Sequence, residues 1–115
     1  MNLPHKEKAY VDRSKLIDYL LSEVHPVGRS KSKFFKRLGF SRDKANLLEK
    51  ELLFIAKSEN VVEVKKSEFG IKYIIDGILK GPSSEARKVR TIWIVEKGES
   101  LPRFVTAYPL MEKGK

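Results

Sequence analysis

The hydrophobic pattern changes its period once along the chain, at Val61, and this change predicts the fold class. Before Val61, apolar residues recur every three or four positions, which is the period of amphipathic helices. After it they alternate in four short runs, which is the period of strands. The segments between these runs are too short for the crossover helices that parallel strands need. We therefore predict an α+β fold with three N-terminal helices followed by a four-stranded antiparallel meander sheet.

Turn and capping residues divide the first half of the chain into three helices. The first spans Val11 to Ser22, has Asp12 as N-cap, and places Leu16, Tyr19 and Leu20 on one face. The second ends at Leu38, before a glycine that can stop a helix. The third follows Ser41, a good N-cap, and is the longest and most apolar of the three. We therefore expect the third helix to pack against the sheet.

The four strands are expected at Val61 to Lys66, Phe69 to Leu79, Val89 to Glu96 and Leu101 to Tyr108. Glycine- and serine-rich turns separate the last three strands and set their register. If the last turn centres between Gly98 and Glu99, Thr91 lies opposite Thr106, and Trp93 lies opposite Phe104. The preceding turn places Ile75 opposite Thr91 and Tyr73 opposite Trp93.

This register gives the sheet two chemically different faces. The aliphatic face is expected to pack against the helices and carries Ile74, Ile78, Ile92, Ile94, Val105 and Ala107. The other face mixes aromatic and hydroxyl groups, as an exposed binding face would, and carries Tyr73, Ile75, Thr91, Trp93, Phe104, Thr106 and Tyr108. Tyr73, Trp93 and Phe104 are candidates for stacking bases, or for the core of a second layer. A slip of one residue in either turn would exchange the faces.

Composition excludes several kinds of site. The 115 residues contain no cysteine and only two histidines. A disulfide scaffold, a thiolate zinc site, an iron–sulfur cluster and a multi-histidine metal centre are therefore excluded, and no metal or cofactor is predicted. No apolar run approaches the length of a membrane span, so we expect no membrane association and a cytoplasmic location. We expect residues 1–115 to form a single domain with a frayed tail at 112–115.

Positive charge is concentrated in the second predicted helix. The chain has 24 Lys and Arg against 15 Asp and Glu, a net charge of +9. Five basic residues and no acid lie between Gly28 and the end of this segment: Arg29, Lys31, Lys33, Lys36 and Arg37. The first, third and fifth recur every four residues and can line one stripe of a helix. This pattern favours binding to phosphates of RNA, although a solvated basic helix face has the same pattern.

His25 directly precedes the basic segment, and its position suggests a general acid or base beside bound phosphate. A histidine that fixes a loop by bonding a backbone carbonyl would also suit this position. A single histidine is a weak signal, and the sequence favours the structural role.

A second group of polar residues is expected on the last two strands. Thr106 and Tyr108 share one face just before a proline ends the strand, and Arg90 and Arg103 lie nearby. Hydroxyl and guanidinium groups on adjacent strands suit recognition of a phosphodiester, although threonine and tyrosine are also common strand residues. The same register brings Asp76 close to Arg90 and predicts a structural ion pair.

Short motifs distributed over nearly the whole chain resemble a bacterial family of small uncharacterised domains. These domains occur alone or at the ends of phage-related and polymorphic-toxin-like proteins. The motifs are Leu3-Pro4, Lys8-Ala9, His25-Pro-Val-Gly-Arg-Ser-Lys31, Phe34-Phe35, Leu38-Gly39-Phe40, Gly70-Ile-Lys-Tyr73, Leu79-Lys-Gly81-Pro82, Val89-Arg-Thr-Ile-Trp93-Ile-Val95 and Pro102-Arg-Phe-Val-Thr-Ala-Tyr108-Pro109. Members of this family resemble the barnase–EndoU–colicin–RelE superfamily of ribonuclease toxins.

The resemblance implies cleavage of RNA without a metal ion, with the ribose 2′-hydroxyl attacking the adjacent phosphate. His25 would be the acid or base, and Thr106 and Tyr108 would orient the reacting group. Arg29, Lys31 and Arg90 would hold the phosphate. A free-standing toxin would also have a neutralising antitoxin or immunity partner. The alternatives are a non-catalytic module of the same fold that binds nucleic acid or protein, and a structural accessory with a basic surface.

Overall fold

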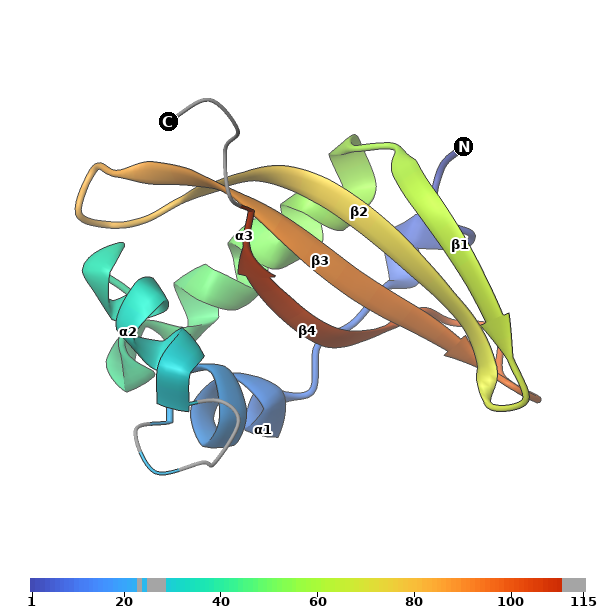
Figure 1. Ribbon diagram of the computed structural model, residues 1–115, viewed down its shortest axis with the longest axis horizontal. Coiled ribbons are helices and arrows are strands. Elements are labelled where there is room, and N and C mark those ends of the chain that lie inside the picture. The colour runs from blue at the N-terminus through green and yellow to red at the C-terminus, as the bar shows by residue number, and fades with distance from the viewer. Residues whose placement is uncertain (23, 25–28, 111–115) are drawn as a thin grey trace.

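The computed structural model describes residues 1–22, 24 and 29–110, and the side chains of all of these except 29 and 30 (Figure 1). His25 and the expected tail at 112–115 lie outside the described residues. Six helical segments precede four strands in the described part of the chain. They are the 3₁₀-helix η1 (Lys6–Lys8), α1 (Arg13–Lys15), the π-helix η2 (Leu16–Leu20), α2 (Arg29–Arg37), the 3₁₀-helix η3 (Arg42–Lys44) and α3 (Ala45–Ser58).

The three expected helices correspond to α1 with η2, to α2, and to η3 with α3. The first is shorter than expected and is not a uniform α-helix, because Leu21 N donates to Leu16 O over 2.8 Å, a π-type bond. Asp12 and Ser41 occupy the N-cap positions, but neither side chain makes a capping hydrogen bond. Their contribution to the helix starts is therefore conformational, since both adopt the extended backbone of an N-cap.

The predicted antiparallel meander is confirmed. The strands are β1 (Val61–Ser67), β2 (Gly70–Lys80), β3 (Ala86–Glu96) and β4 (Arg103–Pro109), and they pair in sequence order. Tyr73 lies opposite Trp93, and Ile75 lies opposite Thr91, as the turn position between β2 and β3 predicts. β1 is shorter than β2, so the β2–β3 hairpin extends beyond it (Figure 1).

A β-bulge in β4 changes the predicted register with β3. Trp93 lies opposite Phe104 as expected, but Ile92 lies opposite Thr106, so Val105 is an extra residue. Thr91 consequently faces Ala107, and the predicted pairing of Thr91 with Thr106 is wrong. The extra residue turns the rest of β4 over, so that Thr106 no longer shares a face with Phe104.

The helices cover the face of the sheet that was expected to be exposed. Trp93, Phe104 and Thr91 are fully buried, and Tyr73 is nearly so. On the opposite face Ile78 is exposed and Ile92 is half-buried, although Ile74 and Ile94 are buried there, outside the main core cluster. The prediction that the aliphatic face packs against the helices is therefore wrong, because the large aromatic side chains of the other face form the core.

Two contacts explain why the aromatic face is the core. α3 lies across it (Figure 1), and Ile55 approaches Gly77 of β2 so closely that a Cβ there would be 2.9 Å from Ile55 Cγ2. The buried Thr91 hydroxyl donates to Ile75 O over 2.7 Å and accepts a 2.8 Å hydrogen bond from Trp93 Nε1. These bonds satisfy both polar groups, which removes the cost of burying them.

The loop between β2 and β3 fixes the C-terminal end of α2. Gly39 ends the helix with φ +101°, and Phe40 N bonds Phe35 O, as predicted for a glycine stop. Ser83 reaches across and donates to Leu38 O from both its backbone nitrogen, at 3.1 Å, and its hydroxyl, at 2.8 Å. This loop therefore ties the basic helix to one end of the sheet. In the described part of the chain, no helix has the length and apolar composition needed to span a membrane.

Candidate functional site

A cluster of polar and cationic side chains, suited to proton transfer and to binding of an anion, centres on the hydroxyl of Tyr19. Lys31 Nζ donates a 3.0 Å hydrogen bond to Tyr19 Oη. Thr106 Oγ1 lies 3.2 Å from the same oxygen and either hydroxyl can be the donor. The ammonium groups of Lys15 and Lys31 also lie over the Tyr19 ring, 5.3 and 5.2 Å from its centre. One phenol, one alcohol and two cations therefore meet at one place.

Three separate elements bring these groups together. Tyr19 lies in the π-helix η2, Lys31 is in the first turns of α2, and Thr106 is on β4, the strand at the edge of the sheet. The π-type turn places Leu16 and Leu20 in the core and leaves Tyr19 half-buried. The bulge at Val105 turns Thr106 out of the core, where it meets Tyr19. Both irregularities thus help to place the two hydroxyl groups next to each other.

The environment lowers the pKa of Tyr19. Partial burial acts to raise it, but the hydrogen bonds from Lys31 and Thr106 and the charges of Lys31 and Lys15 outweigh that effect. The pKa therefore lies below the ordinary value of 10.0. Hydrogen bonds and positive charges favour the phenolate over the phenol, which makes this tyrosine a better proton donor than an exposed one.

The basic residues of α2 differ in their surroundings. Lys31 is half-buried and holds Tyr19, whereas Lys33, Lys36 and Arg37 are exposed. The backbone of Arg29 begins the helix, and its side chain lies outside the described part. Phe35 and Ser32 are buried on the inner side of the helix. α2 therefore presents exposed positive charge next to the Tyr19 cluster.

Arg90 and Tyr108 form a neighbouring polar group on the face of the sheet away from the helices. They lie opposite each other in the β3–β4 pair. Arg90 donates to both carboxylate oxygens of Asp76, at 2.8 and 3.0 Å, which confirms the predicted ion pair. The hydrogen bond to Asp76 raises the pKa of Arg90, and Tyr108 contributes in the same direction. The guanidinium is thus already oriented by a carboxylate on β2.

Arg103 belongs to a different part of the structure. Its guanidinium pairs with Glu96, with Nε 2.9 Å and an Nη 2.7 Å from the same carboxylate oxygen. Glu96 and Arg103 flank the turn between β3 and β4, which lies at the opposite end of β4 from Tyr108. The structure therefore does not bring Arg103 together with the other predicted phosphate-binding residues.

The three predicted base-stacking residues are part of the core. Trp93 and Phe104 have no exposed surface, and their rings make an edge-to-face contact at 5.3 Å between centroids. Tyr73 is 7% exposed. A base cannot stack on a ring face that is already covered, so the stacking assignment is wrong for the folded chain.

Tyr19 and Lys15 are the residues that sequence reasoning missed. The helical spacing of Leu16, Tyr19 and Leu20 places the tyrosine on an apolar helix face and gives it no functional role. Its polar hydroxyl was the available signal, because a buried or half-buried tyrosine normally finds a hydrogen-bond partner. Lys15 lies four residues before Tyr19, a spacing at which side chains meet on a helix.

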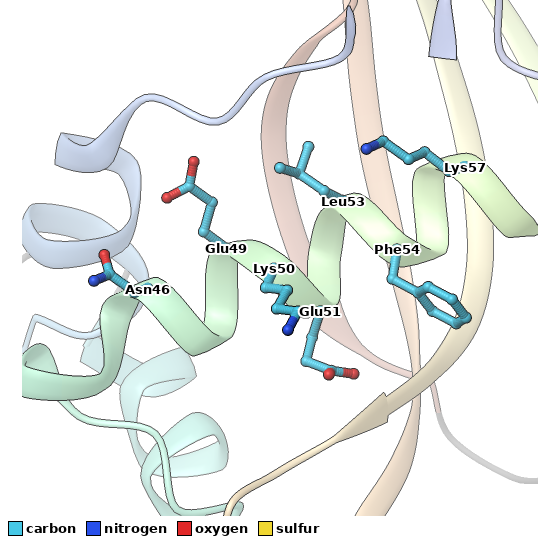
Figure 2. Close-up of a pocket in the computed structure, with 7 residues that line it drawn as sticks. All are labelled: Asn46, Glu49, Lys50, Glu51, Leu53, Phe54 and Lys57. Atoms are coloured by element: carbon cyan, nitrogen blue, oxygen red, sulfur yellow. The ribbon is translucent and has the colours of Figure 1, made fainter. Parts of the chain in front are cut away.

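Two depressions lined by described residues lie beside α3, away from the Tyr19 cluster. One of about 420 Å³ lies along the outer side of α3, and Figure 2 shows Glu51 and Phe54 projecting from the same side of the helix. Another of about 320 Å³ lies between α3 and β2 and is lined by Phe54, Ile78 and Lys80 among others. Among the described residues, no three acidic or histidine side chains lie close enough to hold a metal ion.

The fold is similar to that of a solved bacterial protein. It matches one chain of a contact-dependent growth inhibition toxin–immunity protein complex from Klebsiella pneumoniae 342, with a TM-score of 0.71 and 23% sequence identity. The match covers 93% of this chain and 97% of the other. No curated protein matches the sequence. Residues 2–111 match a family model described as a domain of unknown function, DUF6883, and the chain therefore belongs to that family.

Proposed function

We propose that this chain is a toxin-like ribonuclease that acts on cytoplasmic RNA without a metal ion. The observation that carries the proposal is the hydrogen bonding of Tyr19 Oη by Lys31 and Thr106. The cluster supplies a proton donor and a cation at one place, beside a helix with exposed positive charge. Those are the groups that cleavage of a phosphodiester by its own 2′-hydroxyl needs.

The proposed reaction forms one bond and breaks one bond. The 2′-oxygen attacks the adjacent phosphorus, the bond from phosphorus to the 5′-oxygen breaks, and the products are a 2′,3′-cyclic phosphate and a 5′-hydroxyl end. A general base takes the proton of the 2′-hydroxyl, and a general acid gives a proton to the leaving 5′-oxygen. No redox step or additional reactant is needed.

Each described group of the cluster has a role in this scheme. Tyr19 is the general acid, because its lowered pKa eases proton donation. Lys31 stabilises the negative charge that develops on the phosphate oxygens, and Thr106 orients the phenol. The exposed bases Lys33 and Arg37 bind flanking phosphates. His25 precedes α2 in the sequence and is proposed as the general base.

Arg90 and Tyr108 have a supporting role in the proposal. Tyr108 lies two residues after Thr106 on the same strand, so both side chains are on one face. Arg90, oriented by Asp76, adds a guanidinium beside them that can donate to a phosphate. The fold likeness to a chain of a toxin–immunity complex supports the toxin-like assignment and an immunity-type partner.

The test is cleavage of total RNA in EDTA by purified protein and matched variants. Tyr19→Phe and His25→Ala should each slow cleavage by roughly a hundred- to ten-thousandfold, the usual effect of losing a proton-transfer group. Tyr10→Phe, which removes the hydroxyl of an exposed tyrosine, should cleave like the wild type. Binding to a 2′-deoxy analogue, which lacks the attacking group, should survive both active-site changes.

The alternative function is a non-catalytic binding module of the same fold. Binding of the analogue without cleavage of any RNA by folded wild-type protein would favour that function. Cleavage that persists in Tyr19→Phe would place the acid elsewhere. Weak RNA binding together with tight binding to a separate toxin would assign the chain to the partner side of such a complex.

A further inference from the structure

Lys15 belongs to the Tyr19 cluster, and the proposed reaction gives it no role. Its ammonium group lies 5.3 Å from the centre of the Tyr19 ring, and that of Lys31 lies 5.2 Å from the same centre. Lys15 is the last residue of α1 and Lys31 is in α2, so two separate helices bring the two charges to one side chain. Because like charges repel, the fold holds them near each other at a cost in free energy.

No described acidic side chain neutralises these two charges. Neither Lys15 nor Lys31 takes part in the ion pairs that the described residues form with one another. Asp12 and Asp18 each lie three residues from Lys15 in the sequence, but both are exposed and neither forms an ion pair with it. The cluster therefore carries two positive charges that a bound anion can compensate.

The cluster also has hydrogen-bond donors available for a ligand. An ammonium group has three N–H donors. Lys31 uses one of them on Tyr19, and Lys15 makes no side-chain hydrogen bond to any residue that the structure describes. Both lysines and the hydroxyl-bearing Tyr19 and Thr106 are half-buried, so a ligand can reach them although they have lost part of their hydration. This partial loss strengthens the attraction between opposite charges.

The hydroxyl of Tyr19 indicates that negative charge on oxygen is stabilised at this place. The charges of Lys15 and Lys31 both lower its pKa, and the hydrogen bond from Lys31 acts in the same direction. The phenolate is thus favoured in spite of partial burial. A negatively charged oxygen of a ligand beside the same two ammonium groups would be stabilised in the same way.

We propose that Lys15 and Lys31, together with the two hydroxyl groups of the Tyr19 cluster, bind a phosphate dianion and prefer it to a phosphodiester. Electrostatic attraction is proportional to the charge of the ligand. A phosphate monoester carries nearly two negative charges at neutral pH, whereas a diester carries one. The dianion therefore balances both ammonium groups, and the diester balances only one. The source of the dianion is free inorganic phosphate or the terminal phosphate of a nucleic-acid strand.

This preference has two consequences for RNA cleavage, and both rest on the proposed function. Attack of the deprotonated 2′-oxygen on a phosphodiester produces a phosphorane with two negative charges. Lys15 consequently stabilises the transition state more than it stabilises the bound substrate. A phosphate dianion occupies the same groups as the scissile phosphate, so it inhibits cleavage competitively.

The experiment compares the binding of methyl phosphate and dimethyl phosphate to the purified protein at about pH 8, where the monoester has lost both protons. Methyl phosphate should bind at least roughly tenfold more tightly, and it should raise the pKa of Tyr19 because a nearby anion disfavours the phenolate. Lys15→Gln should weaken its binding roughly ten- to hundredfold, the usual effect of losing one hydrogen bond to a charged group. Lys15→Arg, which keeps the charge, should restore most of the affinity.

Lys57→Gln is the matched control, because it removes one exposed lysine charge from the last turn of α3. Figure 2 shows Lys57 at the far end of that helix from Asn46, which accepts a hydrogen bond from Arg13 of α1. This variant should bind methyl phosphate like the wild type. Equal affinities for the two probes would overturn the proposal, as would equal losses in Lys15→Gln and Lys57→Gln.

A DNA strand, which lacks the 2′-hydroxyl, distinguishes the two sources of the dianion. Tighter binding of a 3′-phosphorylated strand than of the same strand with a 3′-hydroxyl, lost in Lys15→Gln, would identify a strand end as the ligand. Equal binding of the two strands would identify free phosphate. Binding of methyl phosphate that depends on Lys15, in protein that cleaves no RNA, would keep this site and reject the proposed function. Cleavage of RNA without binding of methyl phosphate would reject the site and keep the function.

Discussion

Lys31 on α2 donates a 3.0 Å hydrogen bond to the hydroxyl of Tyr19 in the π-helix η2. The bond joins the basic helix α2 to the π-helix that precedes it in the sequence. Thr106 of β4, at the edge of the sheet, contacts the same tyrosine hydroxyl. Because the two partners are on different elements, their mutual position depends on the whole fold. The ionisation of Tyr19 is therefore a sensitive measure of whether the site is assembled.

We expect Lys31→Met to raise the pKa of Tyr19 toward its ordinary value, because the variant removes a hydrogen bond and a nearby positive charge. The pKa can be measured from the ζ-carbon chemical shift of labelled tyrosine. Lys33→Met removes an exposed charge from the same helix and should shift the pKa much less. Equal shifts in the two variants would show that Lys31 has no special contact.

The same change has a defined effect on stability. Folding lowers the pKa of Tyr19, so its ionisation stabilises the folded state above pH 10. This contribution is lost as the pH falls through the lowered value. Lys31→Met should therefore reduce the free energy of unfolding more at alkaline pH than at neutral pH. Urea denaturation at both pH values measures the difference.

A second prediction concerns the exposed bases of α2. Lys33→Glu combined with Arg37→Glu should weaken RNA binding and reduce the slope of log affinity against log salt by about one to two units, since each phosphate contact contributes nearly one unit. The control is Lys66→Glu with Lys97→Glu, at the opposite end of the sheet. If the control reduces the slope as much, the binding reflects overall charge rather than α2.

A third prediction concerns the loop that holds α2. A Cβ on Gly81 would lie 1.9 Å from Leu38 O, so Gly81→Ala should destabilise the fold by about 1–3 kcal/mol. Ser84 has φ +72°, and Ser84→Gly should instead stabilise it slightly by relieving that conformation. Thermal unfolding of both variants provides the comparison. Similar melting temperatures would mean that the loop can move away from α2.

A fourth prediction concerns the buried Thr91. Thr91→Val removes the acceptor for Trp93 Nε1 and should cost about 1–3 kcal/mol, the usual penalty for an unsatisfied buried donor. Trp93→Phe removes the donor. The double variant should lose less free energy of unfolding than the two single variants lose together, because the same hydrogen bond is lost in each of them. Strict additivity in urea denaturation would indicate that the two groups are not coupled.

The sequence was sufficient to predict the arrangement of the sheet. Strand periodicity and short turns gave four antiparallel strands, and the turn after Gly81 gave the register of Tyr73 with Trp93. The ion pair of Asp76 with Arg90 followed from that register and is confirmed. These features depend on local patterns, which the sequence displays directly.

The packed face and the centre of the site could not be predicted in the same way. Both faces of the sheet carry large apolar residues, so alternation alone does not say which face the helices cover. The π-helix changes the position of Tyr19 by a hydrogen bond that no residue pattern signals. Thr106 was identified as a site residue, but its position depends on a bulge that turn arithmetic assumes to be absent.

The extra residue at Val105 makes β4 serve two purposes that a regular strand could not combine. If β4 were regular and kept Val105, Thr106 would lie opposite Thr91, and its hydroxyl would point toward the hydrophobic interior, in the place now occupied by a methyl group. Deleting Val105 would instead leave Thr106 opposite Ile92 and on its present side of the sheet, because plain alternation from Phe104 then places it there. The side of the sheet that Thr106 occupies is therefore set by its pairing with β3 and not by the number of residues that separate it from Phe104.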